Sequence, residues 1–164
     1  MDETDHSGRI VVRPAQADEA DALTDISMRS KAHWGNDDAF MAQCVESLRV
    51  DIPEIEAGRV IVAEGPEGLL GVMGWAPLEA GRPDEPDWEI SHLFVDPSAM
   101  GRGVGRLLFE EGIVRIRTLG CNVLEILSDP EAKAFYERMG ATPVGDAPSD
   151  AIPGRRLPLL QYTL

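Results

Sequence analysis

The stretch from Trp88 to Gly120 constrains the fold more than any other part of the chain, because it joins an apolar strand, a glycine-rich turn and a helix. Residues 90–95 predict a strand that is apolar enough to be buried on both faces. The strand ends at Asp96-Pro97, since proline has no N–H group to donate to a sheet. The turn that follows alternates glycines with other residues: Gly101, Arg102, Gly103, Val104, Gly105 and Arg106.

A helix that begins near Gly103 directs its free backbone N–H groups and the positive end of its dipole into this turn. Glycine lets the backbone bend tightly and lets a ligand approach the N–H groups without meeting a Cβ atom. The turn therefore favours an anion, and the arginines at 102 and 106 favour a phosphate or diphosphate. The spacing fits neither a P-loop nor a GxGxxG dinucleotide fingerprint. A glycine-rich connection without a ligand is the alternative interpretation.

Two segments carry a resemblance to a known family. Residues 100–105, MGRGVG, resemble the (Q/R)xxGx(G/A) phosphate turn of the GNAT (GCN-five-related) N-acetyltransferase superfamily, with Met100 where the family usually has Gln or Arg. Residues 128–145, SDPEAKAFYERMGATPVG, resemble the tyrosine-bearing helix that follows the next strand in that family. The resemblance extends over residues 9–164 and implies an α/β fold, with a central mixed sheet flanked by helices.

Apolar periodicity and Gly/Pro breakers predict the individual elements. The expected order is β-α-α-β-β-β-α-β-α-β-β, which is the GNAT order, in a single domain over residues 9–164 that follows a frayed segment, 1–8. The strands are expected at 9–13, 59–64, 69–78, 90–95, 122–127, 141–144 and 157–164, and the helices at 18–31, 37–48, 103–120 and 130–139. Residues 50–58 are expected to form a loop, residues 65–68 a hairpin turn and residues 79–87 a mobile loop.

Charge and cysteine content narrow the range of partners and compartments. The chain has 164 residues and a net charge of −14, which disfavours nucleic acid and anionic membrane surfaces and favours cationic substrates such as amines. Cys44 and Cys121 are not expected to form a disulfide, so a reducing compartment fits. We find no signal-peptide pattern and no apolar run near 18 residues, so we expect a cytoplasmic protein.

The resemblance implies acetyl-CoA as co-substrate, no metal, and a set of cofactor-binding residues. In the family, the central strand offers its backbone to the pantetheine arm where a neighbouring strand splays away, and the turn binds the diphosphate. Ser128 stands near the place where the family often has an Asn that contacts the cofactor arm, and Asp129 can instead cap the following helix. The residues implied are Leu93, Phe94, Val95, Gly101, Arg102, Gly103, Val104, Gly105, Arg106, Ser128 and Phe135.

Acetyl transfer to an amine requires a base, because an alkylammonium with a pKa near 10.4 is neutral in only about one molecule in a thousand at pH 7. Glu89 lies at the strand position that serves as general base in several GNAT enzymes. Ser91 is expected on the same face as Glu89, and His92 on the opposite face by strand alternation. We therefore prefer Glu89 to His92. A solvated Glu at a strand start is the alternative.

The leaving thiolate requires a proton, and Tyr136 is the candidate acid. A phenol with a pKa near 10 and a thiol with a pKa near 8.5 are close enough for proton transfer within a held contact. The match of AFYERMG to the family's tyrosine segment implies this role. Tyr136 also belongs to an i, i+3, i+4, i+7 stripe, so a purely structural place in the core is the alternative.

The sequence indicates the residues that bind the acetyl acceptor less clearly than those that bind the cofactor. His33 and Trp34 lie between the first two helices and can stack on a substrate, and Arg155 can bind a carboxylate or merely neutralise acidic neighbours. The apolar late strand permits a homodimer through Leu157, Leu159, Leu160 and Tyr162. The function expected is transfer of acetyl to a primary amine of a small molecule or peptide. A non-catalytic acyl-CoA-binding GNAT domain, acting as sensor or scaffold, is the alternative that Met100 and the missing Asn favour.

Overall fold

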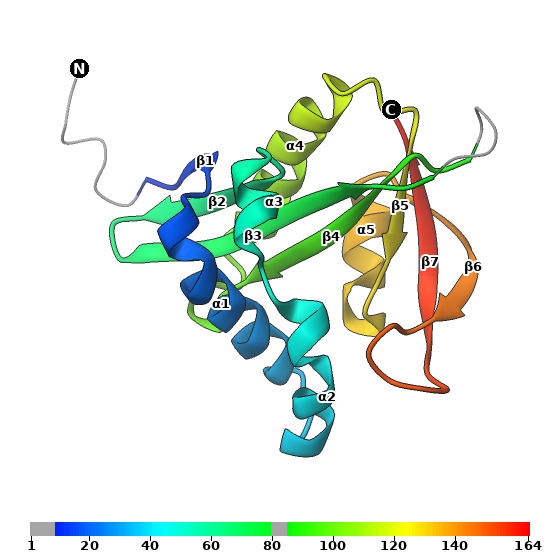
Figure 1. Cartoon of the computed structure of the whole chain (residues 1–164), viewed down its shortest axis with the longest axis horizontal. Coiled ribbons are helices and arrows are strands. Elements are labelled where there is room, and N and C mark those ends of the chain that lie inside the picture. The colour runs from blue at the N-terminus through cyan, green and yellow to red at the C-terminus, as the bar shows by residue number, and fades with distance from the viewer. Residues whose placement is uncertain (1–8, 80–84) are drawn as a thin grey trace.

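The computed structural model describes residues 9–79 and 85–164. The expected frayed segment 1–8 and the centre of the expected loop 79–87 lie outside the described residues. A seven-stranded mixed sheet has the order β1-β2-β3-β4-β5-β7-β6, with α1, α2 and α3 on one face and α4 and α5 on the other (Figure 1). The strands are β1 (Val11–Pro14), β2 (Val60–Gly65), β3 (Gly68–Pro77), β4 (Trp88–Val95), β5 (Val123–Leu127), β6 (Thr142–Pro148) and β7 (Arg156–Thr163). The helices are α1 (Ala20–Ala32), α2 (Asp38–Leu48), α3 (Ile52–Glu56), α4 (Val104–Arg117) and α5 (Lys133–Arg138).

The fold class and the order of elements are confirmed, with one addition. The prediction of a loop over residues 50–58 was wrong, because the chain forms the short helix α3 there. Pro53 lies in the first turn of α3, where a missing N–H costs nothing, and Ile55 is buried against β2. The hairpin at residues 65–68 is confirmed by the pairing of Gly65 with Gly68.

A β-bulge in β4 overturns the predicted placement of His92. His92 pairs with Gly74 and Ile90 pairs with Trp75, so Ser91 is the extra residue between them. Since Glu89 pairs with Ala76, Glu89 and His92 lie opposite residues that share one face of β3. A Cβ atom on Gly74 would lie 2.8 Å from Ser91 Oγ, so glycine is the residue that leaves room for the bulge. Glu89 and His92 therefore lie on the same face, because the bulge breaks the alternation.

The two halves of the sheet separate where β4 meets β5. These parallel strands pair only at Trp88–Leu124 and Glu89–Glu125 and then diverge. This agrees with the expectation that a neighbouring strand splays away from the central strand. The prediction that residues 90–95 are buried on both faces was wrong. Most of β4 is half-buried and Ser91 is exposed, because β5 does not cover this edge of β4.

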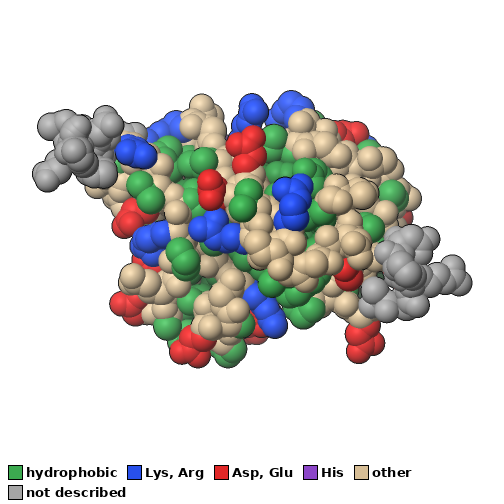
Figure 2. All heavy atoms as spheres, turned by 90° about the horizontal axis from the view of Figure 1, so that it is seen from above, with side chains coloured by type: hydrophobic (Ala, Val, Ile, Leu, Met, Phe, Trp, Pro, Cys, Tyr) green, Lys and Arg blue, Asp and Glu red, His purple; other side chains and the backbone are tan. Residues whose placement is uncertain are grey.

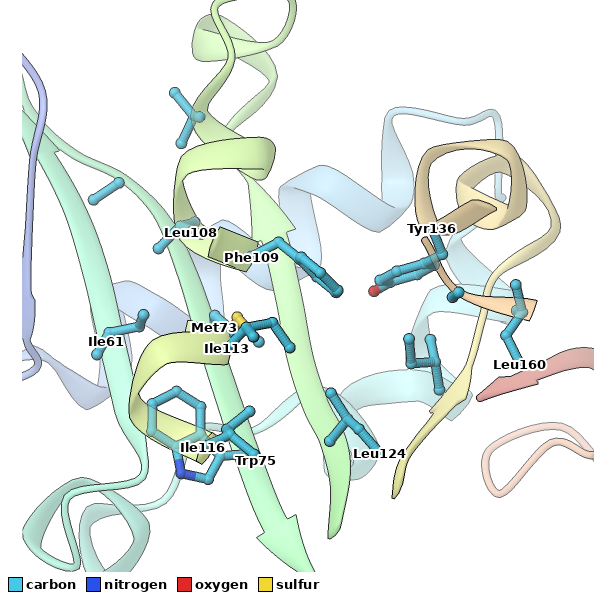
Figure 3. Packing of buried hydrophobic residues seen from close by; sticks show 14 of the residues in the cluster. Ile61, Met73, Trp75, Leu108, Phe109, Ile113, Ile116, Leu124, Tyr136 and Leu160 are labelled. Carbon is cyan, nitrogen blue, oxygen red and sulfur yellow. The ribbon is translucent and has the colours of Figure 1, made fainter. Parts of the chain in front are cut away.

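The larger core lies between the sheet and α4, and it positions α5 (Figure 3). Leu108, Phe109, Ile113 and Ile116 of α4 pack toward Met73 and Trp75 of β3. From α5, the ring of Tyr136 extends toward Phe109, with 6.3 Å between the ring centroids. This aromatic contact joins α4 to α5 across the gap between the half-sheets.

The late strand β7, whose apolar residues permit a homodimer in the sequence analysis, lies inside the chain's own sheet. β7 pairs with β5 on one side and with β6 on the other, and Leu157 and Leu160 are buried within the chain. Leu157 and Leu160 thus contribute to the chain's own core, and β6 is the outer strand at this end of the sheet.

Charges of both signs are interspersed on the face seen from above, where α4 lies at the top of Figure 1 (Figure 2). The α4 ion pairs Arg106–Glu110 and Arg115–Glu111 show the same alternation along the helix. Among the helices of residues 9–79 and 85–164, none is both long enough and apolar enough to span a membrane.

Candidate functional site

The glycine-rich turn forms one wall of a cavity at the N-terminus of α4. Gly101 and Gly103 have φ values of +81° and +80°, a left-handed conformation that favours glycine, and Gly103 caps the helix. The first N–H groups of α4 have no carbonyl partner within the helix. The turn cavity has a volume of about 650 Å³ and is lined by Val95, Ala99, Met100, Gly101, Gly103, Val104, Gly105, Arg106, Phe135, Arg138 and Met139.

The two arginines expected beside the turn have different surroundings. Arg106 lines the turn cavity, and its Nε lies 3.0 Å from Glu110 Oε2. Arg102 does not line this cavity; its Nη1 lies 2.7 Å from Glu67 Oε2 in the β2–β3 hairpin. The same contact lowers the pKa of Glu67. The side chain of Arg102 is therefore held on the outer side of the turn.

A central cavity of about 360 Å³ continues from the turn cavity along the free edge of β4. The two cavities share Val95, Met100, Gly101, Gly105, Phe135 and Arg138. The central cavity also reaches Leu93, Phe94, Trp34 and Tyr136. The residues expected to line the cofactor arm, 93–95 and Phe135, thus lie together in one groove.

A far cavity of about 530 Å³ adjoins the central one and shares Lys31, Leu93, Phe94, Asp129, Ala132 and Tyr136 with it. Its other lining residues include Glu89, Ser91, His92, Ser128 and Asp150. Tyr136 therefore lies at the junction of the central and far cavities. The three cavities form a groove that runs from the α4 turn, between β4 and α5, to the start of β4.

Tyr136 is buried, and its hydroxyl has no hydrogen-bond partner among the residues that the structure describes. Burial, with a contribution from the Asp129 carboxylate, raises the pKa of Tyr136 well above its usual value. The hydroxyl therefore keeps its proton throughout the physiological pH range. It can donate a hydrogen bond to a group in the groove, but it is a weaker acid than a phenol with the ordinary pKa near 10.

Glu89 lines the far cavity close to other carboxylates. Burial raises the pKa of Glu89, and the nearby carboxylates of Glu125 and Asp150 raise it further. A carboxylate whose pKa is raised is a stronger base than an exposed one, which suits general base catalysis.

Ser91 and His92 form a second polar pair in the same cavity. His92 Nε2 lies 3.2 Å from the carbonyl oxygen of Leu48, so Nε2 carries the proton and donates it to that carbonyl. Nδ1 lies 3.2 Å from Ser91 Oγ and accepts the hydroxyl proton of Ser91. Burial lowers the pKa of His92, so the imidazole is neutral at pH 7. Because of the bulge, this pair lies on the face of Glu89.

An ion pair closes one side of the groove. Lys31 Nζ at the end of α1 lies 2.6 Å from Asp129 Oδ1, and the two side chains are 11% and 21% exposed. The carboxylate of Asp129 therefore binds Lys31 and does not cap the following helical turn. The N–H group of Ala132 donates to the backbone oxygen of Asp129 instead. Ser128 is buried in the far cavity and donates its hydroxyl to the Asp129 carbonyl at 2.7 Å.

The three residues predicted for acceptor binding are not brought together. Trp34 lines the central cavity and is 52% exposed. His33 packs edge-to-face against Trp34, with ring centroids 5.1 Å apart, but lines none of the three cavities. Arg155 lies over the ring of Phe40, 4.8 Å from its centroid, and holds the β6–β7 loop against α2. Of the three, only Trp34 faces the groove.

Arg138 and Asp150 are among the lining residues that the sequence analysis did not assign to the site. Arg138 lines both the turn cavity and the central cavity, and Asp150 lines the far cavity. Arg138 lies inside the AFYERMG segment, one helical turn after Phe135, and that spacing could have identified it. Asp150 lies in the β6–β7 loop, where no sequence pattern indicates which way its side chain points.

Comparisons with known proteins agree on one family. The model of the acetyltransferase (GNAT) family matches residues 22–141. A mycothiol acetyltransferase of Propionibacterium freudenreichii is 28% identical over 139 residues, which are 80% of this chain and 44% of that protein. This chain therefore spans less than half of that curated relative.

Solved structures show the same fold. One is the PaiA N-acetyltransferase of Thermoplasma acidophilum, solved in complex with coenzyme A. It superposes on this chain with a TM-score of 0.73 at 12% identity, and the match covers 95% of this chain and 99% of the PaiA chain. The yncA protein of Salmonella typhimurium, solved with acetyl-CoA, gives a TM-score of 0.69 at 19% identity and covers 94% of each chain.

Proposed function

Because the chain belongs to the GNAT acetyltransferase family, we propose that it transfers the acetyl group of acetyl-CoA to a primary amine by direct attack. The observation that carries this proposal is the continuous groove from the α4 turn, along the free edge of β4, to Tyr136. Coenzyme A and acetyl-CoA are bound by the two structural neighbours named above, which supports acetyl-CoA as the donor.

The residues present fit such a donor. The N–H groups at the start of α4 point into the turn cavity and can donate to a diphosphate, as helix N-termini do. No residue of β5 pairs with β4 beyond Glu89 in the described part of the chain, so the backbone of residues 93–95 can pair with an extended pantetheine arm. Acetyl-CoA supplies the activated acyl carbon. The protein orients the donor and the amine and provides the groups that transfer protons.

The acceptor side is suited to an amine that arrives as a cation. Glu89 and Asp150 line the far cavity, and neither is in an ion pair among the described residues. Glu89 accepts the proton of the ammonium, directly or through water, and the neutral amine then attacks the thioester carbonyl. The C–N bond forms and the C–S bond breaks. The second proton of the attacking nitrogen passes through the Tyr136 hydroxyl to the departing sulfur, so CoA leaves as the thiol and Tyr136 ends neutral.

Two features refine this mechanism. Since burial raises the pKa of Tyr136, its main role is to donate a hydrogen bond to the sulfur as negative charge develops there. Since the bulge places His92 on the face of Glu89, the Ser91–His92 pair is a second candidate route for the amine proton. Small-molecule and peptide amines both remain acceptor classes in this proposal, and the name of the mycothiol acetyltransferase relative puts amines of thiol compounds in the screen.

The second candidate function is a non-catalytic domain that binds an acyl-CoA as sensor or scaffold. It is favoured by Met100, which adds no charge to the turn, and by the pairing of Arg102 with Glu67 outside the cavity. The Tyr136 hydroxyl lies at the cavity junction without a hydrogen-bond partner in the described part of the chain, which favours the enzyme.

Calorimetry and turnover test the proposal in sequence. We expect acetyl-CoA and CoA to bind with micromolar affinity and ATP not to bind, and then expect thiol release from acetyl-CoA to depend on an added amine. Binding without turnover for any amine in a broad panel would favour the sensor. Failure of acetyl-CoA and CoA to bind would refute both functions.

A further inference from the structure

We propose that Arg138 is the cationic side chain that binds the diphosphate of the acyl donor, from the opposite wall to the glycine turn. This assignment rests on the proposed function and adds a residue of α5 to a site otherwise made from the turn and β4. It follows from the charge of the groove, from the partners of the nearby arginines and from the position of α5.

The charge of the groove changes sign along its length. The turn cavity is lined by two arginines, Arg106 and Arg138, and by no carboxylate among the described residues. The far cavity is lined by the carboxylates of Glu46, Glu89, Asp129 and Asp150, of which Asp129 is paired with Lys31 and Glu46 with Arg49. A ligand with an anionic group at one end therefore fits with that group in the turn cavity. Its reactive end then lies near Tyr136.

The arginines near the turn differ in what already binds them. Arg102 is paired with Glu67 and Arg106 with Glu110, each through one contact of 3.0 Å or less. Arg138 makes no ion pair with any described residue, and it lines both the turn and the central cavities. Arg138 is exposed at the wall of the groove. In a chain of net charge −14, a guanidinium without an ion-pair partner among the described residues has a large local effect on an incoming anion.

The packing of α5 holds Arg138 opposite the N–H groups of α4. Phe135 and Arg138 are three residues apart and so share a face of α5. The Cε1 atom of Phe135 lies 3.5 Å from the position of a Cβ atom on Gly105, in the first turn of α4. Phe135 also packs edge-to-face on Phe109, with centroids 6.3 Å apart, which fixes the distance between the helices. A diphosphate at Gly105 therefore lies between the helix N-terminus and the Arg138 guanidinium, which can form a bidentate contact.

The test compares Arg138→Gln with Lys133→Gln, a matched loss of one positive charge from the same helix at a residue that lines none of the three cavities. We expect the Kd of CoA to rise about tenfold in Arg138→Gln and to be unchanged in Lys133→Gln. Dephospho-CoA, which keeps the diphosphate but lacks the 3′-phosphate, should show the same tenfold loss. Arg138→Lys should restore part of the affinity, because it keeps the charge without the planar fork.

A truncated donor separates charge recognition from packing. The ratio of kcat/KM for acetyl-CoA to that for S-acetylpantetheine, which has no phosphate, should fall about tenfold in Arg138→Gln only. An unchanged ratio, or equal losses in the two glutamine variants, would overturn the assignment. Retention of dephospho-CoA affinity in Arg138→Gln would overturn it too, since the contact would then be to the 3′-phosphate. Failure of the wild-type protein to bind CoA would overturn the proposed function as well.

Discussion

Gly105 gives the sharpest separation between folding and ligand binding, because a methyl group there fits the folded chain but meets the proposed ligand. Gly105 lies in the first turn of α4, without a positive φ, and lines the turn and central cavities. A Cβ atom would lie 3.5 Å from Phe135 Cε1 and 3.6 Å from Val95 Cγ2, which are ordinary van der Waals contacts. Gly105→Ala should therefore fold without strain.

The expected magnitudes follow from these contacts. Replacing glycine by alanine in a helix contributes up to about 1 kcal/mol, so the free energy of unfolding should stay equal or rise by that amount. The added methyl group occupies the space beside the N–H groups that are proposed to bind the diphosphate. Loss of close approach to one or two charge-assisted hydrogen bonds costs about 1.5–3 kcal/mol, so the Kd of acetyl-CoA should rise roughly 10- to 100-fold.

Gly112→Ala, in the same helix, is the matched control with the opposite expectation. A Cβ atom there would lie 2.6 Å from Met73 Cε, and Met73 is fully buried under α4. Overpacking costs about 1–3 kcal/mol, which exceeds the helix-propensity gain, so we expect a net loss of about 1 kcal/mol. Because Gly112 lines none of the three cavities, the Kd of acetyl-CoA should not change.

Urea unfolding and calorimetry measure the two quantities on both variants. Unchanged affinity in Gly105→Ala would mean that no ligand approaches the backbone there, and the placement of the diphosphate would be wrong. A stability loss above about 1 kcal/mol in Gly105→Ala would mean that the contacts with Phe135 and Val95 are tighter than the structure shows.

Three further substitutions test the site and its supports. Tyr136→Phe should lower kcat by about 10²- to 10⁴-fold and leave the affinity for acetyl-CoA unchanged. The free energy of unfolding should stay within about 0.5 kcal/mol, because the hydroxyl has no partner among the described residues. Unchanged turnover would remove Tyr136 from the mechanism. Glu89→Gln should abolish most turnover and raise Tm at pH 7 by roughly 1–3 °C. Burial and neighbouring carboxylates raise the pKa of Glu89, so wild-type stability is lost as pH rises through that pKa, and the Tm difference should vanish below about pH 4; a difference that persists at low pH would contradict this. Asp87→Ala should lose about 1–3 kcal/mol, because Asp87 accepts from the N–H groups of Asn122 and Val123. Although burial opposes it, those bonds and Cys121 Sγ lower the pKa of Asp87, so its contribution should be present above about pH 4 and fade as pH falls; the same loss at pH 2 would refute it.

The parts of the fold that sequence predicted are those that local patterns determine. The turn at 101–105 requires glycine because two of its residues have positive φ, and α4 begins one residue after the glycine that caps it. The stripe that contains Tyr136 indicated a place in the core as the alternative to a catalytic role, and the ring is buried against Phe109.

What the sequence could not predict depends on distant partners. The bulge at Ser91 exists because Gly74, on another strand, leaves room for it, and period-2 alternation contains no information about that partner. Pro53 was interpreted as a breaker, although in the first turn of α3 it is compatible with a helix. β7 was expected as the last strand, but its position between β5 and β6 depends on strand pairing that no local pattern indicates. The side-chain direction of Arg102 is set by Glu67, which is 35 residues away.

The divergence of β4 and β5 also determines what sets the width of the groove. Between paired strands, backbone hydrogen bonds hold the spacing near 4.8 Å, but this ladder stops after two residue pairs here. Beyond that point, the half-sheets are held apart by rings: Phe109 of α4 lies 6.3 Å from Tyr136 of α5 and 5.4 Å from Tyr162 of β7, between centroids. The aperture is therefore a property of a few side-chain volumes rather than of the backbone. A chain with the same strand order can thus acquire a wider or narrower opening, and a different range of ligands, by exchanging one aromatic residue for another.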